Sequence, residues 1–158
     1  MRIWRKLLRL SSELLDQSGH AAIDATYFDR HRALTHSLNR CDRKVQTVQA
    51  TFLVDTAHGA VIDVHCSTKW SNGTNVGLQV ACVPQGDLRS LAADKGYDDM
   101  SFREKLRSEG VRPLIKHRVF APYDHAHNAR SEDDLSNQRS VCEIVNSVIK
   151  RSYGYSQE

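Results

Sequence analysis

Two neighbouring segments rich in β-branched residues constrain the fold of this chain more than any other feature. Residues 45–55 and 60–66 have this composition, and the short connection between them contains Gly59. Two such segments joined by a short glycine-containing loop predict a β-hairpin. The sheet of this protein should therefore contain at least one antiparallel pair of strands.

The rest of the chain supplies further strands and helices around this hairpin. Periodicity and turn residues predict helices at 3–16, 75–83, 101–109 and 138–150, and strands at 20–24, 88–93 and 111–115. The polar residues 116–137 are expected to form an insertion loop. Pro113 cannot donate to a central ladder, so the last strand should lie near an edge. A hairpin joined to βαβ alternation predicts an α/β fold, with helices on the faces of a mixed sheet.

Length and composition suit one globular domain. The chain has 158 residues, of which 40% are hydrophobic and 26% charged, and it contains no long apolar run that could span a membrane. Its basic first residues do not form a signal peptide. The four cysteines lack the paired spacing of a disulfide framework or a zinc cluster, so we expect buried or idle thiols and a cytoplasmic location.

The distribution of positive charge is more informative than the net charge of +3. Basic residues gather at 2–9, at 30–44 and at 150–151. Such clusters are the electrostatic footprint of phosphate backbones, although a solvated protein face has the same composition. The leucines of the predicted helix at 3–16 are expected to pack on the core, or to be left exposed because an upstream region that would cover them is missing.

Three acidic residues are the candidate catalytic groups. Asp24 and Asp94 each follow a predicted strand, and Glu143 lies on the predicted last helix. Carboxylate oxygens suit Mg²⁺ or Mn²⁺ in two-metal phosphoryl transfer. Taken singly, each has an ordinary alternative, because Asp24 could cap a loop, Asp94 could belong to a turn and Glu143 could lie on an exposed helix face. Asp124, His125 and His127 also invite a zinc site, for which a polar loop is the simpler explanation.

The last predicted helix places polar residues in one narrow stripe. At about 100° per residue, a set of four falls within an arc of about 60°; its members are Arg139, Glu143, Asn146 and Lys150. The opposite side gathers apolar residues, namely Val141, Ile144, Val145 and Val148. If the helix lay beside the acidic edge of the sheet, its basic residues would flank a bound phosphate.

In this order the motifs resemble a transposase of the DDE class from bacterial or archaeal insertion sequences. Asp24 with Thr26 resembles the first acidic motif, and Asp94-Lys95-Gly96-Tyr97-Asp98 resembles the second. The third motif of these enzymes is Tyr, two residues, Arg, three residues, Glu, six residues and Lys. Arg139, Glu143 and Lys150 keep that spacing, and Ser136 stands at the tyrosine position.

The resemblance implies a ribonuclease H-like fold and metal-dependent cleavage and strand transfer on DNA. It implies two ions, Mg²⁺ or Mn²⁺, with Asp24 bridging both and Asp94 and Glu143 completing one site each. It also implies DNA as the partner, at transposon ends and target, nucleoid association and a homo-oligomer on DNA. The residues expected to contact phosphates are Lys95, Arg139, Lys150, Arg30, Arg32, Arg43 and Lys44.

Two departures from the family pattern leave a second function open. Ser136 removes the aromatic hydroxyl, and the chain resembles a catalytic core at 20–154, with 1–19 as the remnant of an upstream region and 155–158 as a tail. A truncated core could be inactive and could bind DNA or full-length transposase as an inhibitor. The sequence therefore predicts a transposase core, with an inhibitory fragment as the alternative.

Overall fold

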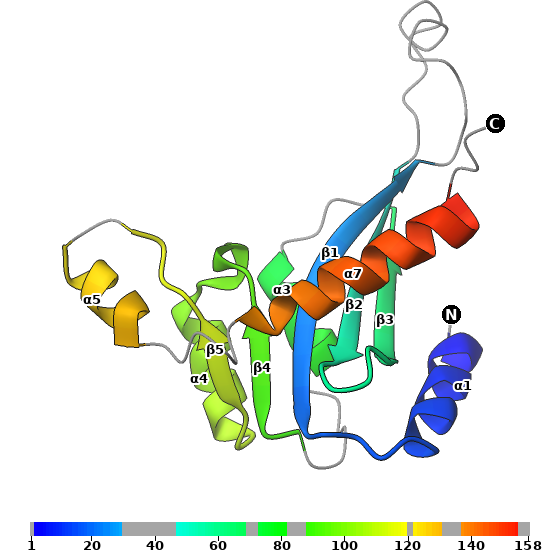
Figure 1. Ribbon diagram of the computed structural model, residues 1–158, viewed down its shortest axis with the longest axis horizontal. Coiled ribbons are helices and arrows are strands. Elements are labelled where there is room, and N and C mark those ends of the chain that lie inside the picture. The colour runs from blue at the N-terminus through cyan, green and yellow to red at the C-terminus, as the bar shows by residue number, and fades with distance from the viewer. Residues whose placement is uncertain are drawn as a thin grey trace, which may run out of the picture.

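A five-stranded mixed sheet forms the centre of the molecule. The computed structural model describes residues 2–29, 47–68, 73–81, 88–119, 122–130 and 137–154. The strands are β1 (His20–Asp29), β2 (Thr47–Asp55), β3 (Val61–Ser67), β4 (Ser90–Ala93) and β5 (Arg112–Ile115), in the sheet order β3-β2-β1-β4-β5 (Figure 1). The first three are antiparallel, whereas β4 and β5 run parallel to β1. The predicted hairpin, the mixed sheet and the edge position of Pro113 in β5 are confirmed.

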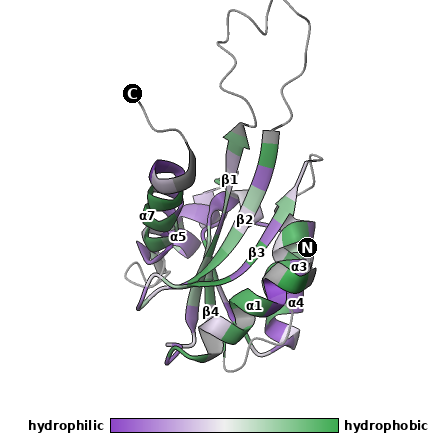
Figure 2. Ribbon diagram, turned by 90° about the vertical axis from the view of Figure 1, so that its right-hand side faces the viewer, coloured by the Kyte–Doolittle hydropathy of each residue, from purple (hydrophilic) through white to green (hydrophobic). Residues whose placement is uncertain are grey.

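Helices cover both faces of this sheet. They are α1 (Arg2–Glu13), α3 (Gly73–Ala81), α4 (Met100–Ser108), α5 (Pro122–Arg130) and α7 (Arg139–Ile149), with the short helical segments η1 (Lys95–Tyr97) and η2 (Lys150–Gly154). Seen along the edge of the sheet, α7 lies on one side and α3 and α4 lie on the other (Figure 2). None of the described helices is long and apolar enough to cross a membrane.

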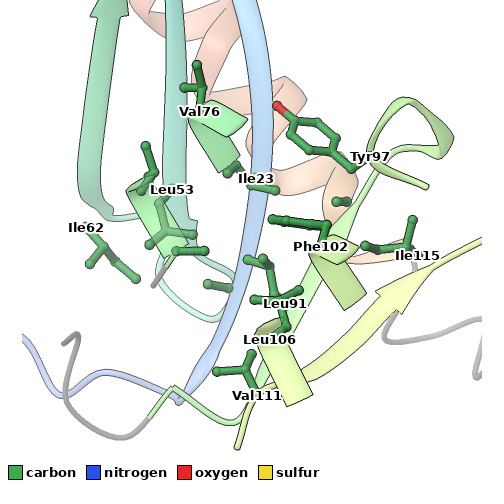
Figure 3. Close-up of a cluster of buried hydrophobic side chains, with 14 residues drawn as sticks. Ile23, Leu53, Ile62, Val76, Leu91, Tyr97, Phe102, Leu106, Val111 and Ile115 are labelled. Atoms are coloured by element: carbon green, nitrogen blue, oxygen red, sulfur yellow. The ribbon is translucent and has the colours of Figure 1, made fainter. Parts of the chain in front are cut away.

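The alternation of side chains along β1 divides the core into two layers. Ile23 points to the face covered by α3 and α4, where it packs with Leu53, Leu91 and Phe102 (Figure 3). Its neighbour Ala22 belongs to the smaller layer under α7. Because consecutive residues of a strand point to opposite faces, Asp24 must lie on the same face as Ala22, beneath α7.

The α7 layer also accounts for the cysteines in the described part of the chain. Cys142 is fully buried under α7 and Cys66 is half-buried in β3; both are free thiols, as predicted. Burial raises the pKa of the Cys142 thiol to about 12, so the group stays protonated and packs as a small apolar side chain.

Three predicted elements differ from the structure. Strand β1 continues five residues beyond Asp24, because β2 pairs with it as far as Asp29. The helix at 3–16 ends at Glu13. The predicted insertion loop contains α5, whose start is favoured by Pro122 at the first position and by Asp124 in the first turn.

The apolar stripe of α1 does not face the core. Ile3, Leu7 and Leu14 are 76%, 54% and 87% exposed, so the expected packing of this stripe is wrong. The opposite, polar side of the helix faces β3 instead. There Arg5 forms an ion pair with Asp63, a residue with no exposed surface, and Arg5 Nε donates to Asp63 Oδ1 at 2.9 Å.

Helix α7 is rolled relative to the orientation that its apolar pattern predicts. Its buried residues are Cys142 and Asn146, whereas Ile144 and Val148 are 60% and 49% exposed. Val141, Val145 and Ile149 also pack against this layer, so on a helical projection the centre of the sheet-facing side is turned by roughly 80° from the predicted apolar face, towards Glu143. The roll leaves two apolar side chains in solvent and brings the acidic side of α7 to the edge of its contact with the sheet.

Candidate active site

The site is built where β1 continues past the end of β4. The parallel register pairs Ile23 with Ala93, so Asp24 and Asp94 occupy the next equivalent positions on neighbouring strands. Asp24 is thus held inside an extended strand, and Asp94 begins the turn that leads into η1. The prediction that Asp24 ends its strand is wrong. Asp24 and Asp94 still lie at neighbouring positions, because β4 ends at Ala93, beside Ile23 of β1.

Asp24 is half-buried beneath α7. Its Oδ2 accepts a hydrogen bond of 3.0 Å from Asn146 Nδ2. Burial raises the pKa of the Asp24 carboxyl, and the charges of Glu143 and Asp94 raise it further, against hydrogen bonds from the Ala25 backbone and Asn146. Burial thus contributes more to the raised pKa of Asp24 than repulsion by the neighbouring acids does.

Asp94 and Glu143 are joined by a cation. Arg139 Nη1 lies 3.0 Å from Asp94 Oδ1 and 3.6 Å from Glu143 Oε1. The three side chains are between 44% and 56% exposed. Asp94 takes the N-cap position of η1 without using its carboxylate as a cap, so the turn does not require that side chain. These contacts connect the second and third acidic motifs directly.

The donor chemistry fits a divalent cation, since Asp24, Asp94 and Glu143 offer the hard oxygen ligands that Mg²⁺ and Mn²⁺ prefer. Asp24 also carries the electrostatic strain of neighbouring acids, which a cation would relieve. Arg139 supplies a positive charge to Asp94 and Glu143. Throughout the described ranges, no group of three or more His, Cys, Asp or Glu side chains is arranged to hold a metal ion.

Basic residues lie on either side of these acids. Lys95 follows Asp94 and is exposed, and Lys150 extends from the end of α7, where its Nζ lies 6.0 Å from the centre of the Phe28 ring. Phe28 points to the same face of β1 as Asp24, so Lys150 lies further along the same strand. Arg30, Arg32, Arg43, Lys44 and Ser136 are outside the described residues.

Sequence reasoning missed the residues that hold the second acidic motif in place. Arg118 donates from its side chain to the backbone carbonyls of Lys95 (3.1 Å) and Gly96 (3.2 Å), and its backbone N–H donates to Asp98 Oδ2 (2.9 Å). The buried Arg103 binds the other oxygen of Asp98, at 2.7 Å from Nη2. No local sequence pattern predicts these contacts, because they depend on the path that the chain takes from the end of β5 at Ile115 to Arg118.

The residues considered for zinc form no such site. Asp124 is buried in α5 and His125 is exposed, so their side chains are in different environments. The His127 ring lies against His117, with 4.0 Å between ring centres. This region therefore serves to pack α5 against residue 117, where Asn128 Oδ1 accepts from the His117 backbone at 2.7 Å.

Comparison with protein families decides the class of protein. The model of the transposase DDE domain matches residues 16–157. The chain belongs to this family. The match spans all five strands and α7, and the mixed five-stranded sheet with flanking helices is consistent with the ribonuclease H-like fold of DDE transposases. No curated protein matches the chain.

Membership assigns a function of the transposase type. DDE transposases act on DNA in transposition and generally use divalent metal ions. The site described above lies wholly within the matched residues, because Asp24, Asp94, Arg139 and Glu143 all fall between 16 and 157.

Proposed function

We propose that this chain is a transposase catalytic core that cleaves DNA at the ends of an insertion sequence and joins the freed end to target DNA. The single observation that carries the proposal is the contact network in which Asn146 binds Asp24 while Arg139 binds both Asp94 and Glu143. That network joins the three acidic motifs of a DDE domain across β1, β4 and α7.

In this proposal the acids hold two divalent ions, Mg²⁺ or Mn²⁺, with Asp24 shared between them. Such ions activate the attacking hydroxyl and stabilise the leaving oxygen in phosphoryl transfer. Asp24 is the suitable bridging group, because it is held by the sheet and by Asn146. Asp94 and Glu143 are more than half exposed and can reorient when Arg139 turns towards a DNA phosphate.

The basic residues form the DNA-binding surface in this proposal. Lys95 and Lys150 lie on either side of the acids, and Arg139 lies among them. Phosphate contacts position DNA without reading its sequence, so these residues set register rather than specificity. The basic segment at 30–44 adds Arg30, Arg32, Arg43 and Lys44 to this surface. We assign 20–154 as the catalytic unit and expect a homo-oligomer on DNA.

The test is metal-dependent nicking of supercoiled plasmid by the purified chain. With Mn²⁺ or Mg²⁺ present we expect slow nicking, and Asp24→Asn should reduce the rate by at least about 100-fold, a loss of more than about 2.7 kcal/mol of transition-state stabilisation. Asp16→Asn, which alters an exposed acid before the sheet, is the matched control.

Equal rates for Asp24→Asn and the wild-type chain would overturn the assignment of Asp24. If the chain bound DNA but did not nick it with metal present, and if Asp24→Asn left that binding unchanged, the result would instead favour an inactive fragment that binds DNA and inhibits active transposase.

A further inference from the structure

Asn146 has a burial and a pairing that packing alone does not explain. It lies on α7, three residues after Glu143, and is only 5% exposed. Its Nδ2 donates to Asp24 Oδ2 across 122 positions of the chain. A helix face that covers a sheet is normally apolar, and burying an amide there is unfavourable unless its polar atoms are matched.

The amide of Asn146 is only half matched. Its Oδ1 is buried and has no hydrogen-bond partner among the described residues. The other buried side-chain atom of this kind in the described ranges is the hydroxyl of Tyr97. An unmatched buried polar group costs about 1–3 kcal/mol, so each calls for an explanation other than stability.

Both unmatched atoms belong to the acidic motifs. Tyr97 follows Asp94 by three residues, and its ring packs against Phe102 in the layer on the other side of the sheet. Burial raises the pKa of the Tyr97 hydroxyl, and among charged groups Asp24 adds most to that rise, which places the two near each other. Unmatched polarity in the described part of the molecule is thus concentrated around Asp24.

We propose that Asn146 is a positioning residue for the reaction, which orients the Asp24 carboxylate and fixes the roll of α7 that carries Glu143. The proposal rests on the function proposed above. A donor on Oδ2 favours one rotamer of the Asp24 carboxylate. The same bond ties the buried face of α7 to β1, and Glu143 lies one helical turn away from that tie.

The two effects follow from one bond, since α7 is rolled towards Glu143 against its own apolar pattern. Ile144 and Val148 remain exposed while Asn146 is buried. If apolar packing set the roll, those two residues would face the sheet and Glu143 would turn away from Asp24. The structure therefore assigns to Asn146 a role that the exposed Ile144 and Val148 oppose, whereas Val141, Val145 and Ile149 pack in the layer beneath α7.

The experiment compares Asn146→Leu with Val145→Ala in the whole chain. Leucine keeps the branching of asparagine at Cγ, although it is larger, and offers no hydrogen-bond donor, whereas Val145→Ala removes packing from the same helix layer and leaves Asn146 in place. For each we would measure the nicking rate, the KM for DNA, the Mn²⁺ concentration at half-maximal rate and direct Mn²⁺ binding by electron paramagnetic resonance.

We expect Asn146→Leu to lower Mn²⁺ affinity about 10- to 100-fold, and kcat with it, which is the usual effect of removing a group that orients a metal ligand. The KM for DNA should change less than about twofold, because the phosphate contacts are untouched. Val145→Ala should leave Mn²⁺ binding as in the wild-type chain. Equal Mn²⁺ binding by Asn146→Leu and the wild-type chain would overturn the proposal.

A readout independent of catalysis separates this proposal from the proposed function. In nuclear magnetic resonance spectra of the metal-free chain, the side-chain NH₂ of Asn146 should exchange slowly with solvent, and that protection should be lost in Asp24→Ala. Nicking activity absent from the wild-type chain, together with a protected amide and Mn²⁺ binding weakened by Asn146→Leu, would contradict the function and support the positioning role. An unprotected amide would overturn the positioning role whatever the activity.

Discussion

Two aspartates three positions apart on the β1–β2 ladder have opposite surroundings. Asp55 ends β2 opposite Ala21, and Asp24 lies in β1 opposite Phe52. Asp55 accepts hydrogen bonds from the backbone N–H and hydroxyl of Ser18 and from the backbone N–H groups of Ala57 and His58, at 2.8–3.0 Å. Although burial acts to raise it, these donors lower the pKa of Asp55.

Asp24 has the reverse balance. Burial raises its pKa, and the nearest charges are those of Glu143 and Asp94, which repel it. A carboxylate that only holds a fold is surrounded by donors, because matched hydrogen bonds stabilise the native state. A carboxylate crowded by other acids is unfavourable for folding and typical of functional sites. The comparison distinguishes a structural acid, Asp55, from a candidate functional acid, Asp24, without any reference to the family.

The largest effect is expected from removing the structural acid. Asp55→Ala leaves the donors of Ser18, Ala57 and His58 without their acceptor, so it should lower the free energy of unfolding by about 2–4 kcal/mol. Urea denaturation measures this loss. A change below about 0.5 kcal/mol would show that the donors are equally well solvated by water.

Acidification should remove the stabilising effect of the Asp55 charge and the destabilising effect of the Asp24 charge. The pKa of Asp55 is lowered by folding, so its favourable contribution is complete above its ordinary value of 3.8 and disappears as pH falls through the folded pKa. The pKa of Asp24 is raised, so its unfavourable contribution is complete above the folded pKa and disappears as pH falls to about 3.8.

At neutral pH we therefore expect Asp55→Asn to be less stable than the wild-type chain and Asp24→Asn to be more stable. Both variants should approach the wild-type stability as pH falls below about 3.8. Melting temperatures at several pH values give this comparison. A difference for either variant that grows on acidification would reverse the sign assigned to its pKa.

A smaller gain is expected from neutralising the functional acid. Asp24→Asn removes the repulsion with Glu143 and Asp94, and its amide oxygen can still accept from Asn146. The free energy of unfolding at neutral pH should rise by up to about 1 kcal/mol, as is common when a strained functional group is replaced. Equilibrium denaturation tests this. A clear loss of stability in Asp24→Asn would show that the Asp24 carboxylate stabilises the fold, as Asp55 does.

The smallest change in stability is expected at Arg139. Its ion pairs with Asp94 and Glu143 are about half exposed, so Arg139→Ala should alter the free energy of unfolding by less than about 0.5 kcal/mol. If Arg139 binds a DNA phosphate, the slope of log binding constant against log salt should become shallower by about one. An unchanged slope would show that Arg139 does not contact a DNA phosphate and only pairs with Asp94 and Glu143.

The order of the strands along the chain could be predicted because it is a local signal, whereas the catalytic role of the three acids stays a prediction. The β-branched segments and Gly59 predict the hairpin, and the spacing of Arg139, Glu143 and Lys150 marks the third motif. The position of Asp24 within β1 could not be predicted, because β1 is longer than its apolar part. Pairing with β2 as far as Asp29 supports residues that no local pattern identifies as strand.

The roll of α7 was the main feature hidden from the sequence. Periodicity places Asn146 in the polar stripe, and the apolar residues on the other side predict that the stripe faces solvent. One long-range hydrogen bond to Asp24 reverses this for Asn146 and leaves Ile144 exposed. A pattern that averages over a helix cannot register a single buried contact of this kind.

The sequence separation of Asp24 and Asn146 also determines when the site can exist during synthesis. The ribosome adds about 5–20 residues per second, so the 122 positions between them correspond to roughly 6–24 s of elongation. Until that interval has passed, the nascent chain contains Asp24 and Asp94 but neither Glu143 nor the amide that orients the first acid. On the function proposed above, a polypeptide emerging beside the cell's DNA would thus acquire its complete acidic site only when nearly the whole domain has been made.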